Sequence, residues 1–141
     1  MNKKIVVLVF VFLTIVIGAF IVYKIWNKPF KDPLKGGAIK VTATQLFSDF
    51  ATNETSAQKK YVPETVGGKI VEVTGEIKEI GKNTDGETYY VLKTNDEVFG
   101  VKCVMDKGYE MSAKSGDVIS IRGFCDGLNS DVIINRCRVE K

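Results

Sequence analysis

The chain has 141 residues, of which 45% are hydrophobic and 26% are charged, and its formal net charge is +3. It contains no histidine, which excludes histidine-based catalytic triads and histidine-ligated zinc sites. Residues 1–40 carry seven lysines and one acidic residue, whereas residues 41–141 carry thirteen basic and sixteen acidic residues. The positive charge therefore belongs to the N-terminal part, and the remainder of the chain is acidic.

An uncharged, apolar segment runs from Ile5 to Tyr23, between lysines on both sides. A helix of this length spans about 28 Å, close to the ~30 Å hydrocarbon core of a bilayer. We therefore predict a transmembrane signal-anchor over residues 1–26. A cleaved signal peptide is the alternative, but its apolar region is usually only about 7 to 15 residues long.

The side of the membrane is less clearly indicated. Lys24, Lys28, Lys31 and Lys35 outnumber the two lysines before the apolar segment, and the positive-inside rule would then keep the C-terminal part in the cytoplasm. The short basic N-terminus instead favours export of the C-terminal part. We expect export, with these four lysines either contacting anionic lipid headgroups or simply solvating a linker.

Residues 27–41 mix prolines, glycines and charges without apolar periodicity, which predicts a tether. An amphipathic helix is predicted over residues 42–62, because Thr42 and Gln45 have capping-box spacing and apolar residues recur after them at helical spacing. These apolar residues are Leu46, Phe47, Phe50, Ala57 and Tyr61.

After Gly68 the apolar period changes to two, and five strands are predicted near residues 71–78, 88–94, 98–104, 118–125 and 132–139. One helix followed by five short strands fits the mainly β, five-stranded Greek-key barrel called the OB-fold, here over residues 66–141. Gly75 and Gly123 fall inside strands where a small barrel must bend. An open antiparallel sheet packed on the helix is the alternative.

Motifs in the strand region resemble the bacterial tRNA_anti-like family of OB-fold putative lipoproteins, of the Bacteroidetes type. They are Lys69-x-Val71-x-Val73-Thr74-Gly75, Gly100-Val101-Lys102-Cys103, Ser115-Gly116-Asp117-Val118, Gly123-Phe124-Cys125-Asp126-Gly127 and Asp131-Val132-x-x-Asn135-Arg136-Cys137. The resemblance implies a single-pass protein of the bacterial inner membrane with a periplasmic C-terminal domain. No cysteine comes directly after the apolar segment, so the helix rather than a lipid must anchor the chain.

Cys103, Cys125 and Cys137 share the strand parity of neighbouring apolar residues, so we expect all three to face inward. Reduced cysteines commonly fill cores as small apolar side chains. A disulfide is the alternative in an oxidising periplasm, and Cys103 with Cys137 is the favoured pair because their strands run side by side in an OB barrel. Paired C-x-x-C spacings are absent, so no metal site or cofactor is expected.

The outward faces of strands two to five would present basic and aromatic side chains. These candidate ligand-binding residues are Tyr89, Lys93, Lys102, Arg122, Phe124, Arg136 and Arg138. Proteins that bind single-stranded nucleic acids combine such residues, although the acidic balance of the domain opposes this interpretation and an ordinary solvated surface also fits.

The sequence carries no nucleophile motif or phosphate-binding glycine loop, so we do not expect an enzyme. We predict a membrane-anchored, exported OB-fold module that binds a protein, a glycan or another ligand without catalysis. A single-stranded nucleic-acid-binding domain and a disulfide- or thiol-containing structural module of the cell envelope are the alternatives.

Overall fold

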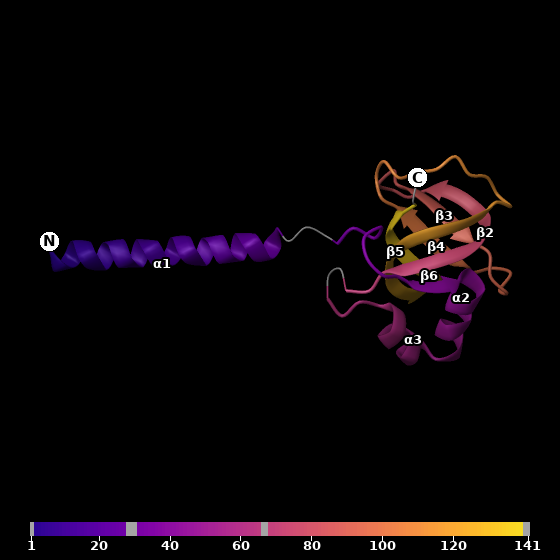
Figure 1. Ribbon diagram of the computed structural model, residues 1–141, viewed down its shortest axis with the longest axis horizontal. Coiled ribbons are helices and arrows are strands. Elements are labelled where there is room, and N and C mark those ends of the chain that lie inside the picture. The colour runs from indigo at the N-terminus through magenta and orange to yellow at the C-terminus, as the bar shows by residue number, and fades with distance from the viewer. Residues whose placement is uncertain (1, 28–30, 66–67, 140–141) are drawn as a thin grey trace. The chain divides into compact units, whose positions relative to one another are not determined.

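The computed structural model describes residues 2–27, 31–65 and 68–139 (Figure 1). The chain divides into two compact units, Met1–Phe30 and Lys31–Lys141. Lys28, one of the predicted lipid contacts, and residue 66, the predicted start of the barrel, lie outside the described residues.

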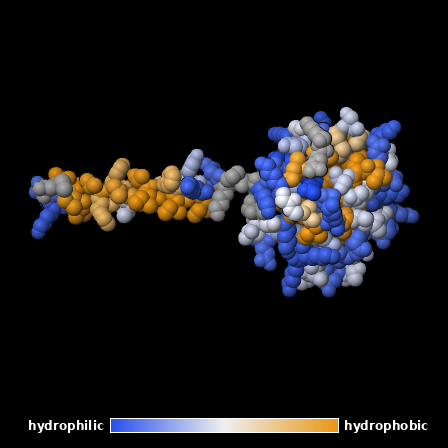
Figure 2. All heavy atoms as spheres, viewed as in Figure 1, coloured by the Kyte–Doolittle hydropathy of each residue, from blue (hydrophilic) through white to orange (hydrophobic). Residues whose placement is uncertain are grey.

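The first unit is the helix α1 (Lys3–Trp26), which has 24 residues and no buried side chain. Its most apolar window has a mean hydropathy of 3.3, and Figure 2 shows apolar residues along its length. At ~1.5 Å per residue the helix is about 36 Å long, enough to cross a bilayer core. Its length and composition fit a membrane anchor and a signal sequence alike.

The second unit contains two short helices in place of the single predicted helix over residues 42–62. They are α2 (Ala43–Thr52) and α3 (Glu54–Tyr61). The prediction is wrong at Asn53, where the backbone is extended and the side-chain oxygen accepts the N–H of Ser56, capping a new helix. The predicted cap at Thr42 is confirmed, because its hydroxyl accepts the N–H of Gln45.

The predicted tether over residues 27–41 is also wrong in its second half. Strand β1 (Ile39–Thr42) pairs in parallel with the start of β2, Ile39 lying opposite Val71. Two alternating apolar residues are too short a pattern to indicate a strand in the sequence, and only a partner strand stabilises it. Pro33 is buried as well, so the segment that precedes β1 belongs to the folded unit.

The remaining strands form a closed barrel. They are β2 (Val71–Lys82), β3 (Thr88–Leu92), β4 (Val101–Met105), β5 (Val118–Asn129) and β6 (Asp131–Arg138). Their order is β2-β3-β4-β6-β5, and β5 pairs back onto β2 (Figure 1). The parallel β4–β6 pair and this return pairing produce the five-stranded barrel of the OB-fold, which excludes the open sheet.

Both predicted bend glycines are places of close approach. A Cβ on Gly123 would lie 2.7 Å from the Cγ2 of Ile134, and the β5–β6 register shifts around this position. A Cβ on Gly75 would lie 2.9 Å from that of Ala43 and 3.2 Å from that of Leu92. Gly123 therefore fits the predicted bend. Gly75, by lacking a side chain, instead allows Ala43, the first residue of α2, to pack directly on the barrel.

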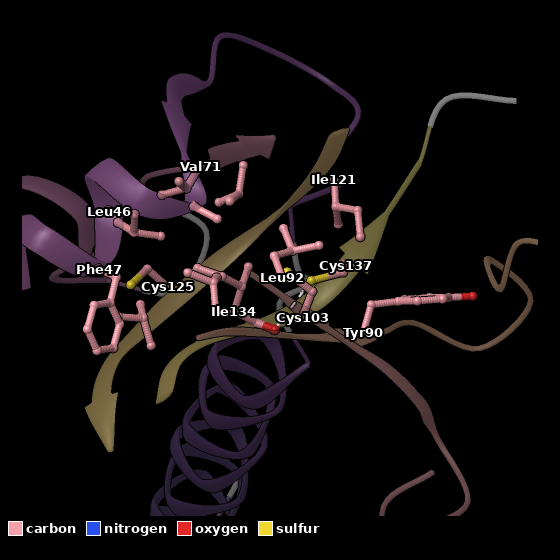
Figure 3. Close-up of a cluster of buried hydrophobic side chains, with 14 of the residues drawn as sticks. Leu46, Phe47, Val71, Tyr90, Leu92, Cys103, Ile121, Cys125, Ile134 and Cys137 are labelled. Carbon is pink, nitrogen blue, oxygen red and sulfur yellow. Dashed lines mark hydrogen bonds between the residues drawn. The ribbon is translucent and has the colours of Figure 1, made fainter. Parts of the chain in front are cut away.

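The core joins the barrel interior to the two helices. Leu46, Phe47 and Phe50 of α2 are buried in the same cluster as the inward residues of the strands (Figure 3). Each such side chain contributes about 1.5–3 kcal/mol of stabilisation when it leaves water. Between β4 and β5, Tyr109 and Met111 pack against this cluster without forming a helix.

Candidate functional site

The seven predicted ligand-binding residues do not form one continuous face. Tyr89 lies on β3 and Lys102 on β4, and Arg136 lies on the adjoining strand β6. Arg122 and Phe124 lie on β5, which is separated from β3 by β2 in the barrel order. The outward residues Tyr89, Lys102, Val104, Ile133 and Arg136 together are called the β3–β4–β6 face.

Tyr89 is held in place by its neighbours on β2. Gly81 is its cross-strand partner, and a Cβ on Gly81 would lie 2.5 Å from the tyrosine ring. The hydroxyl of Tyr89 donates to the Oε1 of Glu79 at 3.2 Å, and this hydrogen bond raises the pKa of Tyr89. The ring of Tyr89 therefore packs against the backbone of Gly81, and a hydrogen bond to Glu79 fixes its hydroxyl. The sequence pattern of basic and aromatic residues did not indicate these contributions of Gly81 and Glu79.

Lys102 covers the same ring. Its Nζ lies 4.1 Å from the ring centroid of Tyr89, a cation–π contact that contributes about 0.5–1 kcal/mol at an exposed site. Val104 is paired with Tyr89, and Ile133 with Lys102, so half-buried apolar side chains flank the pair on both sides. Val104 and Ile133 were not among the predicted site residues, because alternation within a strand does not indicate which outward apolar residues lie beside Tyr89 and Lys102.

Arg136 occupies an irregular point of β6. Cys103 and Met105 of β4 pair with Ile134 and Cys137, so two residues of β6 face one residue of β4. Arg136 has a φ of 52°, a left-handed conformation that costs a non-glycine residue roughly 1–2 kcal/mol. Bulges re-aim side chains, and this one turns Arg136 toward a depression of about 260 Å³. The lining residues are Glu87, Val104, Met105, Asp106, Asn135 and Arg136.

The predicted residues on and beside β5 contact protein groups instead. The Nε of Arg122 lies 2.7 Å from the Oε2 of Glu72. Arg138 pairs with Asp106 at 2.7 Å and with Asp32 at 3.1 Å. Hydrogen bonding to Asp106 raises the pKa of Arg138. Phe124 is only 7% exposed.

Lys93 lies just after β3 and lines a different depression, of about 380 Å³. Its backbone N–H donates to the carbonyl of Glu76 at 2.8 Å. The depression also contains Lys78, Asp96 and Glu97, a mixture of charges without a dominant sign. Lys93 therefore does not extend the β3–β4–β6 face.

The three cysteines are free, fully buried thiols, which confirms the predicted inward orientation. Cys103 and Cys137 lie close together in Figure 3, and the thiol of Cys137 donates to the carbonyl of Ile134 at 3.3 Å. Burial raises the pKa of Cys137, with the contact to Cys103 adding to it, and burial raises the pKa of Cys125 to about 11. A disulfide between Cys103 and Cys137 stays a prediction.

Within residues 2–27, 31–65 and 68–139, no group of three or more Cys, Asp and Glu side chains is placed to hold a metal ion. The β3–β4–β6 face combines a fixed aromatic ring, a lysine and apolar flanks, with an arginine at its end. Such a face can bind a ring or planar group and pair with a negative charge.

A family model described as tRNA_anti-like matches residues 1–139. Among solved structures, one described as "Crystal structure of yeast Stn1 and Ten1" is similar at 14% sequence identity and a TM-score of 0.46. The similarity covers 75% of this chain and 64% of that chain, so this chain spans less than two thirds of the other's length. No curated protein matches the chain. The family match over nearly the whole length, together with the closed five-stranded barrel, shows that the chain belongs to the tRNA_anti-like family of OB-fold proteins.

Proposed function

We propose that this protein is a membrane-anchored, exported OB-fold module that binds a negatively charged ligand on its β3–β4–β6 face without catalysis. The observation that carries the proposal is the Tyr89 ring, which packs against Gly81 while the Lys102 ammonium lies 4.1 Å from its centroid. An aromatic side chain that is already ordered loses little conformational entropy when a ligand packs on it.

Two features support the membrane anchor. Helix α1 is apolar on all sides, and none of its described side chains is buried. Such a helix in water would expose far more apolar surface than soluble proteins tolerate. A periplasm-dependent reporter enzyme fused after Lys141 tests the side. We expect activity, and activity of only a cytoplasm-dependent reporter would overturn export.

The charge and shape of the β3–β4–β6 face support an anionic ligand. Lys102 has a ring rather than a carboxylate as its neighbour, so an incoming anion need not displace an internal ion pair. Val104 and Ile133 offer apolar surface to the less polar parts of the same ligand. Acidic peptides and uronate-containing glycans have this chemistry.

Single-stranded nucleic acid is the second candidate, because a base could stack on Tyr89 while a phosphate meets Lys102. Two of the arginines needed to follow a phosphate backbone, Arg122 and Arg138, are paired with carboxylates. Since neutralising phosphates supplies most of the non-specific affinity for nucleic acids, this pairing favours a short acidic ligand over a polynucleotide.

The binding experiment uses the full chain in phosphatidylcholine nanodiscs, with poly-L-glutamate, a uronate oligosaccharide and a thymidine oligonucleotide as separate probes. We expect poly-L-glutamate or the uronate to bind, and Tyr89→Ala and Lys102→Gln to weaken that binding about tenfold, or ~1.4 kcal/mol each. Lys114→Gln is the matched control, since Lys114 is exposed in the segment between β4 and β5.

Binding that is unchanged in both variants, or absent for every probe at low salt, would overturn the proposed ligand face. Binding of the oligonucleotide alone, with an affinity that falls steeply with salt, would select the second candidate.

A further inference from the structure

The segment before β1 is held on the barrel with its acidic group inward. The carboxylate of Asp32 accepts the N–H of Leu34 at 3.0 Å and pairs with Arg138 at 3.1 Å. The carbonyl of Gly36 accepts from the Nη1 of Arg122 at 3.4 Å. Lys31 and Lys35 stay exposed. This short segment therefore turns its only carboxylate toward the protein and its lysines toward solvent.

The adjoining outward surface of β1, β2 and β5 continues this pattern. The register places Lys40 beside Glu72, and Glu72 beside Arg122. The next row places hydroxyls side by side, and those of Thr74 and Ser120 lie 3.0 Å apart. The residues Lys40, Thr42, Glu72, Thr74, Ser120 and Arg122 are called the β1–β2–β5 face.

Two depressions lie on this face and share Glu72. The larger has a volume of about 520 Å³ and is lined by residues of β1, α2, α3 and β2, including Lys40. The smaller has a volume of about 240 Å³ and is lined by Glu72, Ser120, Arg122, Arg138 and Val139. Among the described residues that line them, Tyr61 alone is aromatic, and it is 1% exposed. These linings offer hydroxyls and cations rather than a ring on which a base or a sugar could stack.

Basic side chains outnumber the acidic ones in residues 31–40 and around the two depressions of the β1–β2–β5 face. Four carboxylates beside these depressions have basic partners: Asp32 and Asp106 pair with Arg138, Glu72 with Arg122, and Asp49 with Lys60. Among the residues that the structure describes, Lys31, Lys35 and Lys40 take part in no ion pair. Because Asp32 and Asp106 share one guanidinium, these six basic and four acidic groups carry a net charge of +2, which is available to an external anion.

We propose that residues 31–40 and the β1–β2–β5 face together bind the headgroups of anionic phospholipids. The inference rests on the membrane anchoring of the proposed function and adds a second surface to it. Charge complementarity supports this partner, since basic segments beside a span are attracted to anionic bilayers. Chain continuity supports it too, because only residues 27–30 separate α1 from Lys31. The hydroxyl of Thr42 accepts the N–H of Gln45 and keeps its own hydrogen to donate to a phosphate oxygen, whereas Ser120 already donates to Glu72.

The test compares the full chain in nanodiscs of phosphatidylcholine alone and of phosphatidylcholine with phosphatidylglycerol. Acetylation of each lysine by a water-soluble reagent is followed by mass spectrometry. In the anionic discs we expect acetylation at Lys31, Lys35 and Lys40 to slow about threefold or more, and high salt to remove the difference because it screens exposed charges. Lys82, Lys107 and Lys114 serve as internal controls and should react equally in both discs.

A second measurement uses hydrogen exchange of residues 31–38 in the anionic discs. We expect faster exchange in the triple variant Lys31→Gln, Lys35→Gln, Lys40→Gln than in the wild type. The matched variant Lys82→Gln, Lys107→Gln, Lys114→Gln should exchange as the wild type does. A uniform slowing of all lysines, or equal rates in both discs with the chain incorporated, would overturn the headgroup surface and leave the anchor intact. Failure of the chain to enter either disc would overturn both.

Discussion

The two polar faces of the barrel use the same residue types in different ways. On the β1–β2–β5 face the guanidinium of Arg122 lies 2.7 Å from a carboxylate, and Arg138 beside it contacts two carboxylates and the ring of Tyr109. On the β3–β4–β6 face the ammonium of Lys102 lies over an aromatic ring instead. The comparison teaches that an outward basic residue contributes to stability or to binding according to what the neighbouring strand places opposite it.

The largest predicted change is the loss of stability caused by replacing Arg138. Arg138→Ala removes two ion pairs and the contact with Tyr109, and it leaves Asp32 and Asp106 without a cation. We expect the free energy of unfolding to fall by about 1.5–3 kcal/mol, the range for hydrogen bonds to charged groups. Denaturant unfolding measures it, with Lys102→Ala as the comparison variant, which should lose only about 0.5–1 kcal/mol, the contribution of its cation–π contact with Tyr89. Equal losses for the two variants would show that the faces do not differ in this way.

Gly81 offers a sharper test of the β3–β4–β6 face. In Gly81→Ala the new Cβ would lie 2.5 Å from the ring of Tyr89, so the half-buried ring must move away. We expect affinity for the acidic probe to fall about fivefold, or ~1 kcal/mol, with a smaller loss of stability. Titration of the variant in nanodiscs measures the affinity. An alanine that leaves binding unchanged would mean that the position of the Tyr89 ring does not matter.

The pH dependence of unfolding stability measures the contribution of the Asp32 carboxylate. Its hydrogen bond from the Leu34 N–H, followed by the charge of Arg138, lowers the pKa of Asp32 below the ordinary value of 3.8. A lowered folded pKa means that the contribution to stability is complete above pH 3.8 and is lost as pH falls through the folded pKa. Asp32→Asn should therefore lose less stability than the wild type on acidification below pH 3.8. Parallel pH profiles of the two proteins would contradict this.

The smallest predicted effect is the slow chemical modification of the three buried cysteine thiols. Because burial raises the pKa of Cys125 to about 11 and that of Cys137 as well, few thiolates form near pH 8. We expect alkylation of the native reduced protein to be slow at Cys125 and Cys137 for this reason, and slow at Cys103 because its side chain is fully buried. Alkylation of all three should be rapid after denaturation. Counting thiols in denatured, exported protein tests the predicted pair: one free thiol supports a disulfide, and three exclude it. Rapid native alkylation would mean that the barrel opens on the timescale of the reaction.

Periodic patterns predicted much of the fold. The apolar helix follows from an uncharged run, and the five strands follow from local alternation, which reflects the alternate burial of side chains in a strand. The order of these elements favoured a barrel over an open sheet, and the pairing of β5 with β2 decided between them. The same patterns missed β1 and the division at Asn53. Four residues of β1 gain stability only from their pairing with β2, and the cap at Asn53 depends on a backbone turn that alternation does not encode.

The sequence by itself determined that an apolar helix precedes an acidic, cysteine-containing β-domain without histidine chemistry. Only the tertiary structure decided which outward residues meet, because partners such as Glu72 and Arg122, or Gly81 and Tyr89, are joined by strand register and barrel closure. A shift of one residue in register would exchange these neighbours while leaving the composition of each strand unchanged. The candidate site therefore depends on the pairing of strands, whereas the fold class depends on the pattern within each strand.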